Sequence, residues 1–496
     1  MNAMRTNYKN LLLLSTFLWV LTPGCKKDFL EVSPQGSLTE ALFPKNSTDA
    51  LLATNAVYAQ MRVWQFHSGG FPILDIISDD TRKGSNPGDG ARLELFDNFN
   101  FNSTASDIFP WYAANYQAIK AANVVIQYVP EIEMDESVKS RYIAEARFLR
   151  GLFYFNLVRA FGAVPKVTTV NTEFDAARAS VNELYNDIII PDLMYAATTL
   201  PEKSQYGASD AGRATRGAAK GMLAKVYLYR GNWQQAADYA IEVINSVQYS
   251  LESEFANAFS IEGQNGQESI FEIGALPFES TTNGGNQFAN TQGVRGTPNR
   301  GWGFNRPSMS LIGAFEQTDS RRDGSVIFLG EVLDGILIGG DLSTPDTTWT
   351  DASETTILEV ECYNQKVWVP GSTTLELWGQ NVKVMRYSEI LLIASEALNE
   401  LGMSSSALQY LNEVRVRANV DDATETGQSA LSDIILNERR VELAMEGNRF
   451  YDLVRTNKAQ QFLGPLGFVT GKHELFPIPQ SEIDLSGGTL SQNSGW

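Results

Sequence analysis

The chain has 496 residues, of which 43% are hydrophobic and 20% are charged, a composition typical of a folded, water-soluble protein. Its 39 basic and 58 acidic residues give a net charge of -19, which argues against a nucleic-acid-binding role, because that role needs a positive face. Two histidines (His67, His473) and two cysteines (Cys25, Cys362) leave almost no material for zinc-finger, histidine-rich metal or disulfide-rich classes.

The first 24 residues predict an export signal. Arg5 and Lys9 form a positive start, and an apolar run follows over residues 11–21. This run is shorter than the about 20 residues that a helix needs to cross a bilayer. A small residue directly before Cys25 favours a lipoprotein signal that is cleaved there, so that Cys25 is acylated and lipid holds the protein at a membrane. A short buried helix is the alternative.

Helical periodicity begins near Asp49, where apolar residues recur at spacings of four, three and four as far as Val63. A Gly-, Asp- and Asn-rich stretch over residues 78–102 breaks the pattern, and helical signals return over residues 111–129. A further helix is predicted over residues 139–161. Its second half is apolar around most of its circumference, which is typical of a helix buried inside a large body.

Two stretches repeat one design of paired helices. In residues 215–247 and again in 386–418, apolar residues are spaced by 4, 3, 4 and 3, and a glycine lies between the two helices. Each stretch has about 34 residues, the length of a tetratricopeptide helix pair. Two unrelated helical hairpins of similar length are the alternative. We therefore predict a mainly α fold with a tetratricopeptide-type helical-hairpin scaffold over about 45–247 and 380–460.

Between these stretches lies a loop-rich insertion, about 248–372, that is rich in Gly, Asn, Thr and Ser. It contains short β-type runs such as residues 269–273 and 366–369, so it is expected to form loops and short β-strands on the helical scaffold. Loops that a rigid frame positions often carry recognition. This insertion and residues 78–102 are therefore the two candidate site regions of a single body spanning residues 25–496.

The aromatic residue most suited to ligand binding is Trp302, which has a glycine on either side. Glycines expose the ring and let another surface approach it. A sugar ring presents a patch of C–H groups that packs on an indole face, while Asn299 and Arg300 are placed to reach its hydroxyls. Clamping of the loop onto the scaffold is the alternative role for Trp302. Trp64, at the end of the first helix, is a weaker candidate.

Polar residues in the stretch 78–102 form a second group of candidates. Asp80, Arg82 and Asn86 combine carboxylate, guanidinium and amide groups that can hydrogen-bond pairs of sugar hydroxyls, with a solvated turn as the alternative. No catalytic residue is predicted, because a glycosidase needs two carboxylates about 5–10 Å apart across a bond, and neighbouring aspartates in a loop rarely give that geometry. No metal site or cofactor motif is evident. Calcium binding by scattered Asp and Asn residues is left open, although no EF-hand spacing occurs.

Charges are dense over residues 438–449, on a predicted helix. Arg439 and Glu442 are three residues apart, as are Glu446 and Arg449, so that each pair is expected to meet on the helix surface. We interpret them as structural ion pairs that tie this helix to the scaffold, and not as a catalytic centre.

Four sequence stretches together resemble the SusD/RagB family, the nutrient-capturing surface lipoproteins of Bacteroidetes. They follow one another in this order over residues 25–496: CKKDFLE at 25–31; AEARFLRG at 144–151, ending in FGAVP at 161–165; MRYSEI at 385–390; and NERRVEL at 437–443, continuing through GNRFYDL at 447–453 to FPIP at 476–479. Each stretch alone is modest, and the set is specific.

The resemblance implies an outer-membrane lipoprotein that faces the cell exterior, with a tetratricopeptide-type scaffold and a variable ligand face. Family members bind oligosaccharide, or in some cases peptide, and deliver it to a SusC-like TonB-dependent transporter, without being hydrolases themselves. We therefore expect a glycan-binding protein anchored through Cys25. A peptide-capturing member of the same family, or a tetratricopeptide adaptor that binds proteins and no small molecule, are the alternatives.

Overall fold

A computed structural model gives the structure of the protein over residues 44–67, 71–86, 88–171, 177–275, 287–341, 349–350, 357–370 and 379–496. The chain divides into two units, residues 1–45 and 46–496. The predicted export signal (1–24) and Cys25 belong to the first unit and lie outside the described residues. The helical scaffold and the candidate site both belong to the second unit.

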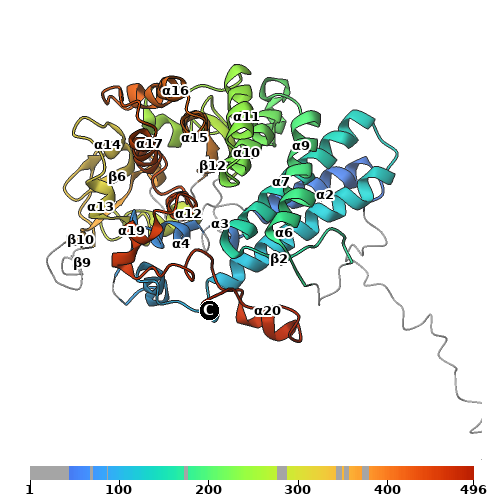
Figure 1. Cartoon of the computed structure of the whole chain (residues 1–496), viewed down its shortest axis with the longest axis horizontal. Helices are drawn as coiled ribbons and strands as arrows, with labels where there is room; N and C mark the ends of the chain where they lie inside the picture. The colour runs from blue at the N-terminus through green and yellow to red at the C-terminus, as the bar shows by residue number, and fades with distance from the viewer. Residues whose placement is uncertain are drawn as a thin grey trace, which may run out of the picture. The chain divides into compact units, whose positions relative to one another are not determined.

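Long helices packed side by side form the scaffold of the second unit (Figure 1). Along the array, α2 packs on α6, α6 on α7, α7 on α9, α9 on α10, α10 on α11, α11 on α15, and α15 on both α16 and α17. The mainly α prediction is therefore confirmed. The bounds are α2 (Ser47–Gln60), α6 (Ile108–Tyr128), α7 (Glu136–Phe161), α9 (Ile190–Thr199), α10 (Arg216–Tyr229), α11 (Trp233–Asn245), α15 (Tyr387–Glu400), α16 (Ser404–Arg417) and α17 (Gln428–Glu442).

Both predicted helix pairs are present, as α10 with α11 and as α15 with α16. In each pair a glycine with a positive φ, Gly231 (66°) or Gly402 (77°), follows the first helix, and its missing side chain permits that conformation. The two pairs are neighbours in space, because α11 packs on α15 although residues 246–386 separate them in the chain. The insertion therefore leaves the scaffold and returns to the same place.

Helix α7 is buried along most of its length, as its apolar sequence predicts. The Asp135 side chain caps its N-terminus by accepting hydrogen bonds from two backbone N–H groups, and Gly162 follows its last turn. At its edge, Arg150 makes a bidentate pair with Asp192 of α9, with N–O distances of 2.7 and 3.0 Å. Among the described helices, none combines the length and the apolar character needed to span a bilayer.

Short helices connect these elements. They are α3 (Trp64–His67), α4 (Phe71–Ile76), α5 (Glu94–Asp97), α8 (Val181–Leu184), α12 (Gln287–Gln292), α13 (Met309–Ile312), α14 (Arg321–Ser325), α18 (Arg449–Arg455), α19 (Ala459–Leu463) and α20 (Gln480–Leu485). The π-helical turn η4 (Tyr185–Ile189) links α8 to α9. Single 3-10 turns are η2 (Ala91–Leu93), η3 (Val129–Glu131), η5 (Lys203–Gln205), η6 (Ala208–Asp210), η7 (Phe255–Phe259), η9 (Gln365–Val367) and η10 (Gly464–Leu466).

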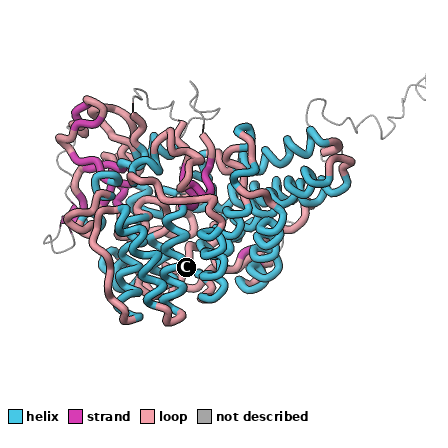
Figure 2. The backbone as a smooth tube through the Cα atoms, turned by 90° about the horizontal axis from the view of Figure 1, so that it is seen from above, coloured by secondary structure: helices cyan, strands magenta, loops and turns pink. Residues whose placement is uncertain are grey.

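The described strands form antiparallel pairs, most of which lie among loops beside the stacked helices (Figure 2). The pairs are β1 (Thr81–Gly84) with β5 (Phe304–Pro307), β2 (Val164–Pro165) with β3 (Arg178–Ala179), β4 (Ser269–Ile273) with β12 (Val382–Arg386), β6 (Val326–Phe328) with β11 (Cys362–Asn364), β7 (Val332–Leu333) with β8 (Ile336–Leu337), and β9 (Trp349–Thr350) with β10 (Ile357–Glu359). The pair β4–β12 joins the insertion to the scaffold, because β12 runs directly into α15.

One of the two predicted β-type runs is confirmed and the other is wrong. Residues 269–273 are strand β4, whereas the run 366–369 begins in the 3-10 turn η9. The Lys366 side chain explains the turn, because its Nζ is directed inward and donates to Glu446 Oε1 (2.7 Å) and to the backbone carbonyl of Ala444 (2.8 Å). The Asn364 side chain also supports the turn, because its oxygen accepts from Lys366 N–H (2.9 Å).

The dense charges at the end of α17 are structural ion pairs, but their predicted partners are wrong. Glu442 is the last residue of α17 and is fully buried, and it pairs with Arg386 (2.9 Å), Arg417 (2.5 Å) and Arg321 (3.1 Å) from three other elements. Although burial raises the pKa of Glu442, the surrounding arginine charges outweigh it and hold that pKa well below its ordinary value.

The helix ends before the second predicted pair can form on its surface. Glu446 instead pairs with Arg386 (2.8 Å) and Lys366 (2.7 Å), while Arg449 begins α18. These bonds tie α17, α15 and the insertion into one buried polar cluster. Spacing along the sequence predicted neighbours on one helix, whereas the partners come from elements far apart in the chain.

Candidate ligand-binding site

Trp64 projects from a short helix that Phe66 and His67 anchor in the interior. In α3, Phe66 is buried and meets Phe153 of α7 edge to face, with 5.7 Å between ring centroids. His67 is also buried, and its Nε2 lies 2.9 Å from the backbone carbonyl of Arg62. Burial lowers the pKa of His67 to about 4, so that it is neutral at pH 7. With these anchors fixed, the indole of Trp64 stays 36% exposed.

Trp302 lies in a loop that is pressed onto α12 and the residue after it. Its backbone N–H donates to the carbonyl of Asn290 (2.8 Å), and the N–H of Gly303 donates to that of Gly293 (3.0 Å). A Cβ on Gly301 would lie 2.4 Å from the Cα of Gly293, so only glycine permits this approach. The loop is therefore clamped by its glycines and backbone, and the Trp302 side chain remains 36% exposed.

The two tryptophans meet, although the sequence separates them by more than two hundred residues. Their ring centroids are 5.8 Å apart and the ring planes are inclined by 55°. Contacts between α12 and α3 bring the two segments together. We call these residues the Trp64–Trp302 pair. Two half-exposed indoles at an angle offer apolar faces on which a ring with a C–H surface can pack.

Asn299 and Arg300 differ in their access to solvent. Asn299 is exposed in the same loop as Trp302. Arg300 is buried, its guanidinium lies 3.9 Å from the ring centroid of Trp368, and its Nη1 donates to the carbonyl of Val369 (3.1 Å). Burial lowers the pKa of Arg300. Arg300 therefore fastens the Trp302 loop to the segment at 368–369 and is not exposed to a ligand, contrary to the prediction.

Asp80 and Arg82 are not available to a ligand, contrary to the sequence-based prediction. Asp80 is 1% exposed and accepts a hydrogen bond from Arg440 Nε at 2.6 Å. Arg82 is 2% exposed, and its Nη1 donates to the backbone carbonyls of Ser78 (3.2 Å) and Thr81 (2.9 Å). The reason is that residues 81–84 form a buried strand, β1, instead of an exposed loop. We remove both residues from the candidate site.

Strand β1 nevertheless connects the two predicted site regions. It pairs with β5, which follows the Trp302 loop, and Ser85 N–H donates to the carbonyl of Gly303 (2.5 Å). Asn86 lies in the next turn, half-buried, where its side-chain oxygen accepts from Gly88 N–H (2.9 Å) and Lys83 Nζ donates to its carbonyl (3.0 Å). Asn86 thus remains a candidate at the edge of the site.

Sequence reasoning missed Arg295, which joins this turn to the insertion. Its Nη1 donates to Ser85 Oγ (3.0 Å) and Asp89 Oδ2 (2.5 Å), and its Nε donates to Asp341 Oδ2 (2.7 Å). The guanidinium is partly exposed, and the Arg295 Cβ would lie 3.0 Å from a side chain added at Gly303. The sequence feature that could have identified Arg295 is its position between Gly293 and Gly296, in the same Gly-rich stretch as Trp302.

Metal-binding chemistry has no support in the described part of the chain. Over those residues, no three histidine, cysteine, aspartate or glutamate side chains are grouped so that they could hold a metal ion. The candidate site consists of the aromatic pair, with the exposed Asn299 in the Trp302 loop and with Arg295 packed against Gly303.

Comparison with known proteins identifies the family of the chain. A family model described as the SusD family matches residues 267–496, and a second, described as "Starch-binding associating with outer membrane", matches residues 28–228. A SusD-like protein of Formosa agariphila is 30% identical over 503 residues, which cover 95% of this chain and 97% of the relative. The chain belongs to the SusD family.

Solved structures of SusD-like proteins share the fold. A laminarin-binding SusD-like protein is 29% identical with a TM-score of 0.76, and the match covers 91% of this chain and 100% of that one. Surface glycan-binding protein A from Bacteroides fluxus is 25% identical with a TM-score of 0.75, over 91% and 100% of the two chains. The tetratricopeptide-type scaffold predicted for this SusD-family chain is thereby confirmed, and the family is one of binding proteins and not of enzymes.

Proposed function

We propose that this SusD-family protein binds oligosaccharide at the Trp64–Trp302 pair and has no enzymatic activity of its own. The observation that carries the proposal is the pair itself: two indoles, each 36% exposed, with ring centroids 5.8 Å apart, on segments that are otherwise firmly anchored. The similarity to a laminarin-binding SusD-like protein, which is 29% identical, supports the choice of a glycan over a peptide or a protein partner.

The chemistry of the proposed site follows from its two kinds of group. The C–H face of a sugar ring packs on the indole faces and is removed from water, while its hydroxyls exchange hydrogen bonds with the amides of Asn299 and Asn86 and the guanidinium of Arg295. An open site buries little ligand surface, so its affinity is modest. Tethering the protein close to its partner compensates through a high effective concentration.

The proposal includes how the glycan is passed on. Cys25 carries lipid that anchors the protein to the outer membrane, facing the cell exterior, and the protein delivers its glycan to a SusC-like TonB-dependent transporter. The basic and apolar character of residues 1–24 supports the anchor, and the outer-membrane association named for the family that matches residues 28–228 supports the location. No nucleic acid takes part in this function.

Calorimetric titration with laminari-oligosaccharides, followed by a panel of other glycans, tests the binding function. We expect Trp302→Ala to weaken binding at least several-fold with the fold intact, because it removes one of the two ring faces. Tyr239→Ala is the matched control, since Tyr239 stacks on Tyr227 (5.7 Å between centroids) in another partly exposed aromatic pair, on α10 and α11. Binding of peptides or proteins, together with no detectable binding of any glycan in the panel, would contradict the proposal.

Membrane fractionation of the full-length chain tests the anchor. Cys25→Ser removes the thiol that accepts the lipid, so the variant should leave the membrane fraction while the natural chain stays in it. A variant that remains firmly bound would show that Cys25 is not the anchor, and it would leave the glycan-binding test unaffected.

A further inference from the structure

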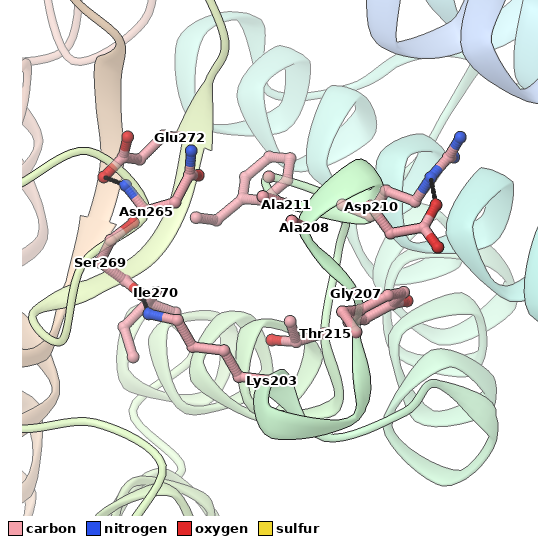
Figure 3. A pocket seen from close by; sticks show the side chains of 14 residues that line it. Lys203, Gly207, Ala208, Asp210, Ala211, Thr215, Asn265, Ser269, Ile270 and Glu272 are labelled. Atoms are coloured by element: carbon pink, nitrogen blue, oxygen red, sulfur yellow. Dashed lines mark hydrogen bonds and ion pairs between the residues drawn. The ribbon is translucent and has the colours of Figure 1, made fainter.

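A cavity of about 200 Å³ lies at the junction of the scaffold and the insertion (Figure 3). One side is formed by the connection between α9 and α10, which contains the turns η5 and η6, and the other side is formed by strand β4 and the turn before it. None of its lining residues belongs to the Trp64–Trp302 pair or to the groups around that pair. It is therefore a second, independent concave site.

The size of the cavity limits what it can hold. Its volume corresponds to about six or seven water molecules, at roughly 30 Å³ each. It lies below the roughly 300–1,000 Å³ of pockets that enclose drug-sized ligands. One ring of about a dozen non-hydrogen atoms fits this space, whereas a chain of several rings does not.

The carboxylates that line the cavity are already neutralised by cations. Glu272 accepts from Lys383 Nζ (2.5 Å) and from Asn381 Nδ2 (2.8 Å). On the opposite wall, Asp210 accepts from Arg213 Nε (2.8 Å) and from Arg141 Nη1 (3.3 Å). Because each of these carboxylates has its cation, the cavity does not call for a cationic ligand, and a neutral polar molecule suits these carboxylates better than a cation.

Three polar groups at the cavity retain hydrogen-bonding capacity. Lys203 Nζ donates to the carbonyls of Gly266 and Ser269 (3.0 Å for Ser269), which uses two of its three donors. Burial lowers the pKa of Lys203 to about 8. In the described part of the chain, no hydrogen bond engages the side-chain amide of Asn265 or the hydroxyl of Ser269. In Figure 3, Asn265 and Ser269 lie on the β4 side of the open space, and the Lys203 side chain extends from η5 toward Ser269.

The remaining walls supply apolar surface. Tyr206, Ala208, Ala211 and Ile270 line the cavity beside the polar groups. A site with apolar walls and a few convergent donors and acceptors is typical of small-molecule pockets. A pyranose ring combines C–H faces with hydroxyls that both donate and accept, so it matches the two kinds of surface together.

We infer that this cavity binds one neutral sugar ring. Its hydroxyls accept from the ammonium of Lys203 and exchange hydrogen bonds with the Asn265 amide and the Ser269 hydroxyl, while its C–H face packs on the apolar wall. The ring comes either from a free monosaccharide or from the end of a longer glycan. This inference is independent of the Trp64–Trp302 site, because the two sites share no residue.

Saturation-transfer NMR on the folded chain, with glucose, galactose, mannose and xylose in turn, detects weak binding of this kind. Two variants alter the cavity in different ways. Ala211→Trp fills it, and Asn265→Gly removes the amide but keeps a residue that tolerates the positive φ of 53° found there. Ser209→Trp is the matched control, because Ser209 lies in the same turn η6, is exposed and does not line the cavity.

The natural chain, Ser209→Trp and Trp302→Ala should all transfer saturation to at least one sugar, and Ala211→Trp and Asn265→Gly should reduce that signal at least five-fold. If the cavity binds the end of a longer glycan, Ala211→Trp should also weaken binding of a laminari-oligosaccharide. If it binds a free monosaccharide, Ala211→Trp should weaken monosaccharide binding and leave oligosaccharide binding unchanged. No signal with any of the sugars, or a signal that only Trp302→Ala removes, would overturn the inference and leave the aromatic site standing.

Discussion

Residues 78–86 and 299–303 both supplied predicted site residues, but their site candidates lie in different environments. Most of the first is buried, and Asp79 there makes a bidentate pair with Arg449 at 2.8 and 3.0 Å. The second presents Trp302 at the surface. The segments are nevertheless neighbours, because β1 of the first pairs with β5, which directly follows the second.

The difference shows that partners, and not local composition, decide whether a charged segment is exposed. Asp79 and Asp80 are buried because Arg440 and Arg449, about 360 residues away in the chain, neutralise them. Trp302 stays outside because its neighbouring glycines allow the backbone, and not the ring, to pack inward. The first segment therefore holds the fold together, whereas the second presents the exposed indole at which we propose that ligand binds.

The largest expected effect comes from the buried ionic cluster. Glu442→Gln leaves Arg386, Arg417 and Arg321 without their shared carboxylate, and breaking a buried ion pair costs about 3–5 kcal/mol. Urea unfolding followed by circular dichroism measures the free energy of unfolding. Glu136→Gln is the control, because Glu136 pairs with Lys139 at the surface, where such a pair contributes at most about 1 kcal/mol. Equal effects of the two variants would contradict this account of the cluster.

The second prediction separates folding from binding in the buried segment. Asp80→Asn removes the charge that faces Arg440, and we expect the free energy of unfolding to fall by about 1–3 kcal/mol, since Asp79 still lies 3.0 Å from Arg440. Glycan affinity should not change, because Asp80 is buried away from the Trp64–Trp302 pair. Calorimetry that shows a loss of affinity in a fully folded Asp80→Asn protein would return Asp80 to the site.

The third prediction concerns the glycine contact that positions Trp302. Gly301→Ala places a Cβ about 2.4 Å from Gly293, so the loop must shift, at a cost of about 1–3 kcal/mol. We expect several-fold weaker glycan binding from the displaced indole. Gly274→Ala is the control, since an added Cβ there meets no atom within 4 Å. Unchanged affinity in Gly301→Ala would show that the loop position does not matter for binding.

The last prediction concerns how stability depends on pH. Burial raises the pKa of Asp75 to about 7, although Gly447 N–H donates to its carboxylate (2.8 Å). An aspartate in the unfolded chain has a pKa of about 3.9. Between these values the folded protein holds a proton that the unfolded chain releases, so this group's contribution to stability falls as pH rises from about 4 to about 7.

Asp75→Asn removes this titration. The free energy of unfolding of the natural chain, relative to the variant, should therefore increase as the pH falls from 7 to 4. Thermal and urea unfolding at several pH values measure the difference, with Asp422→Asn, at an exposed position, as the control. Identical pH profiles for the natural chain and Asp75→Asn would contradict a raised pKa at Asp75.

Sequence periodicity predicted the helix pairs because each helix buries one face against its immediate neighbour. The packing of α11 on α15 could not be read in this way, since it joins segments on either side of a long insertion. The candidate site likewise has a part that the sequence predicts and a part that it does not. Trp64 and Trp302 were each recognisable as candidates, yet their meeting depends on contacts between α3 and α12 that no local pattern records. The burial of Asp80 and Arg82 depends in the same way on distant partners.

A double-mutant cycle on the Trp64–Trp302 pair tests the central claim most directly. Calorimetry would compare the natural chain, Trp64→Ala, Trp302→Ala and the double variant with the same oligosaccharide. If one sugar segment packs on both indoles, each single variant binds at least several-fold more weakly, and the two losses depart from additivity by about 0.5 kcal/mol or more. Unchanged affinity in both single variants, or losses that simply add, would contradict a shared aromatic platform.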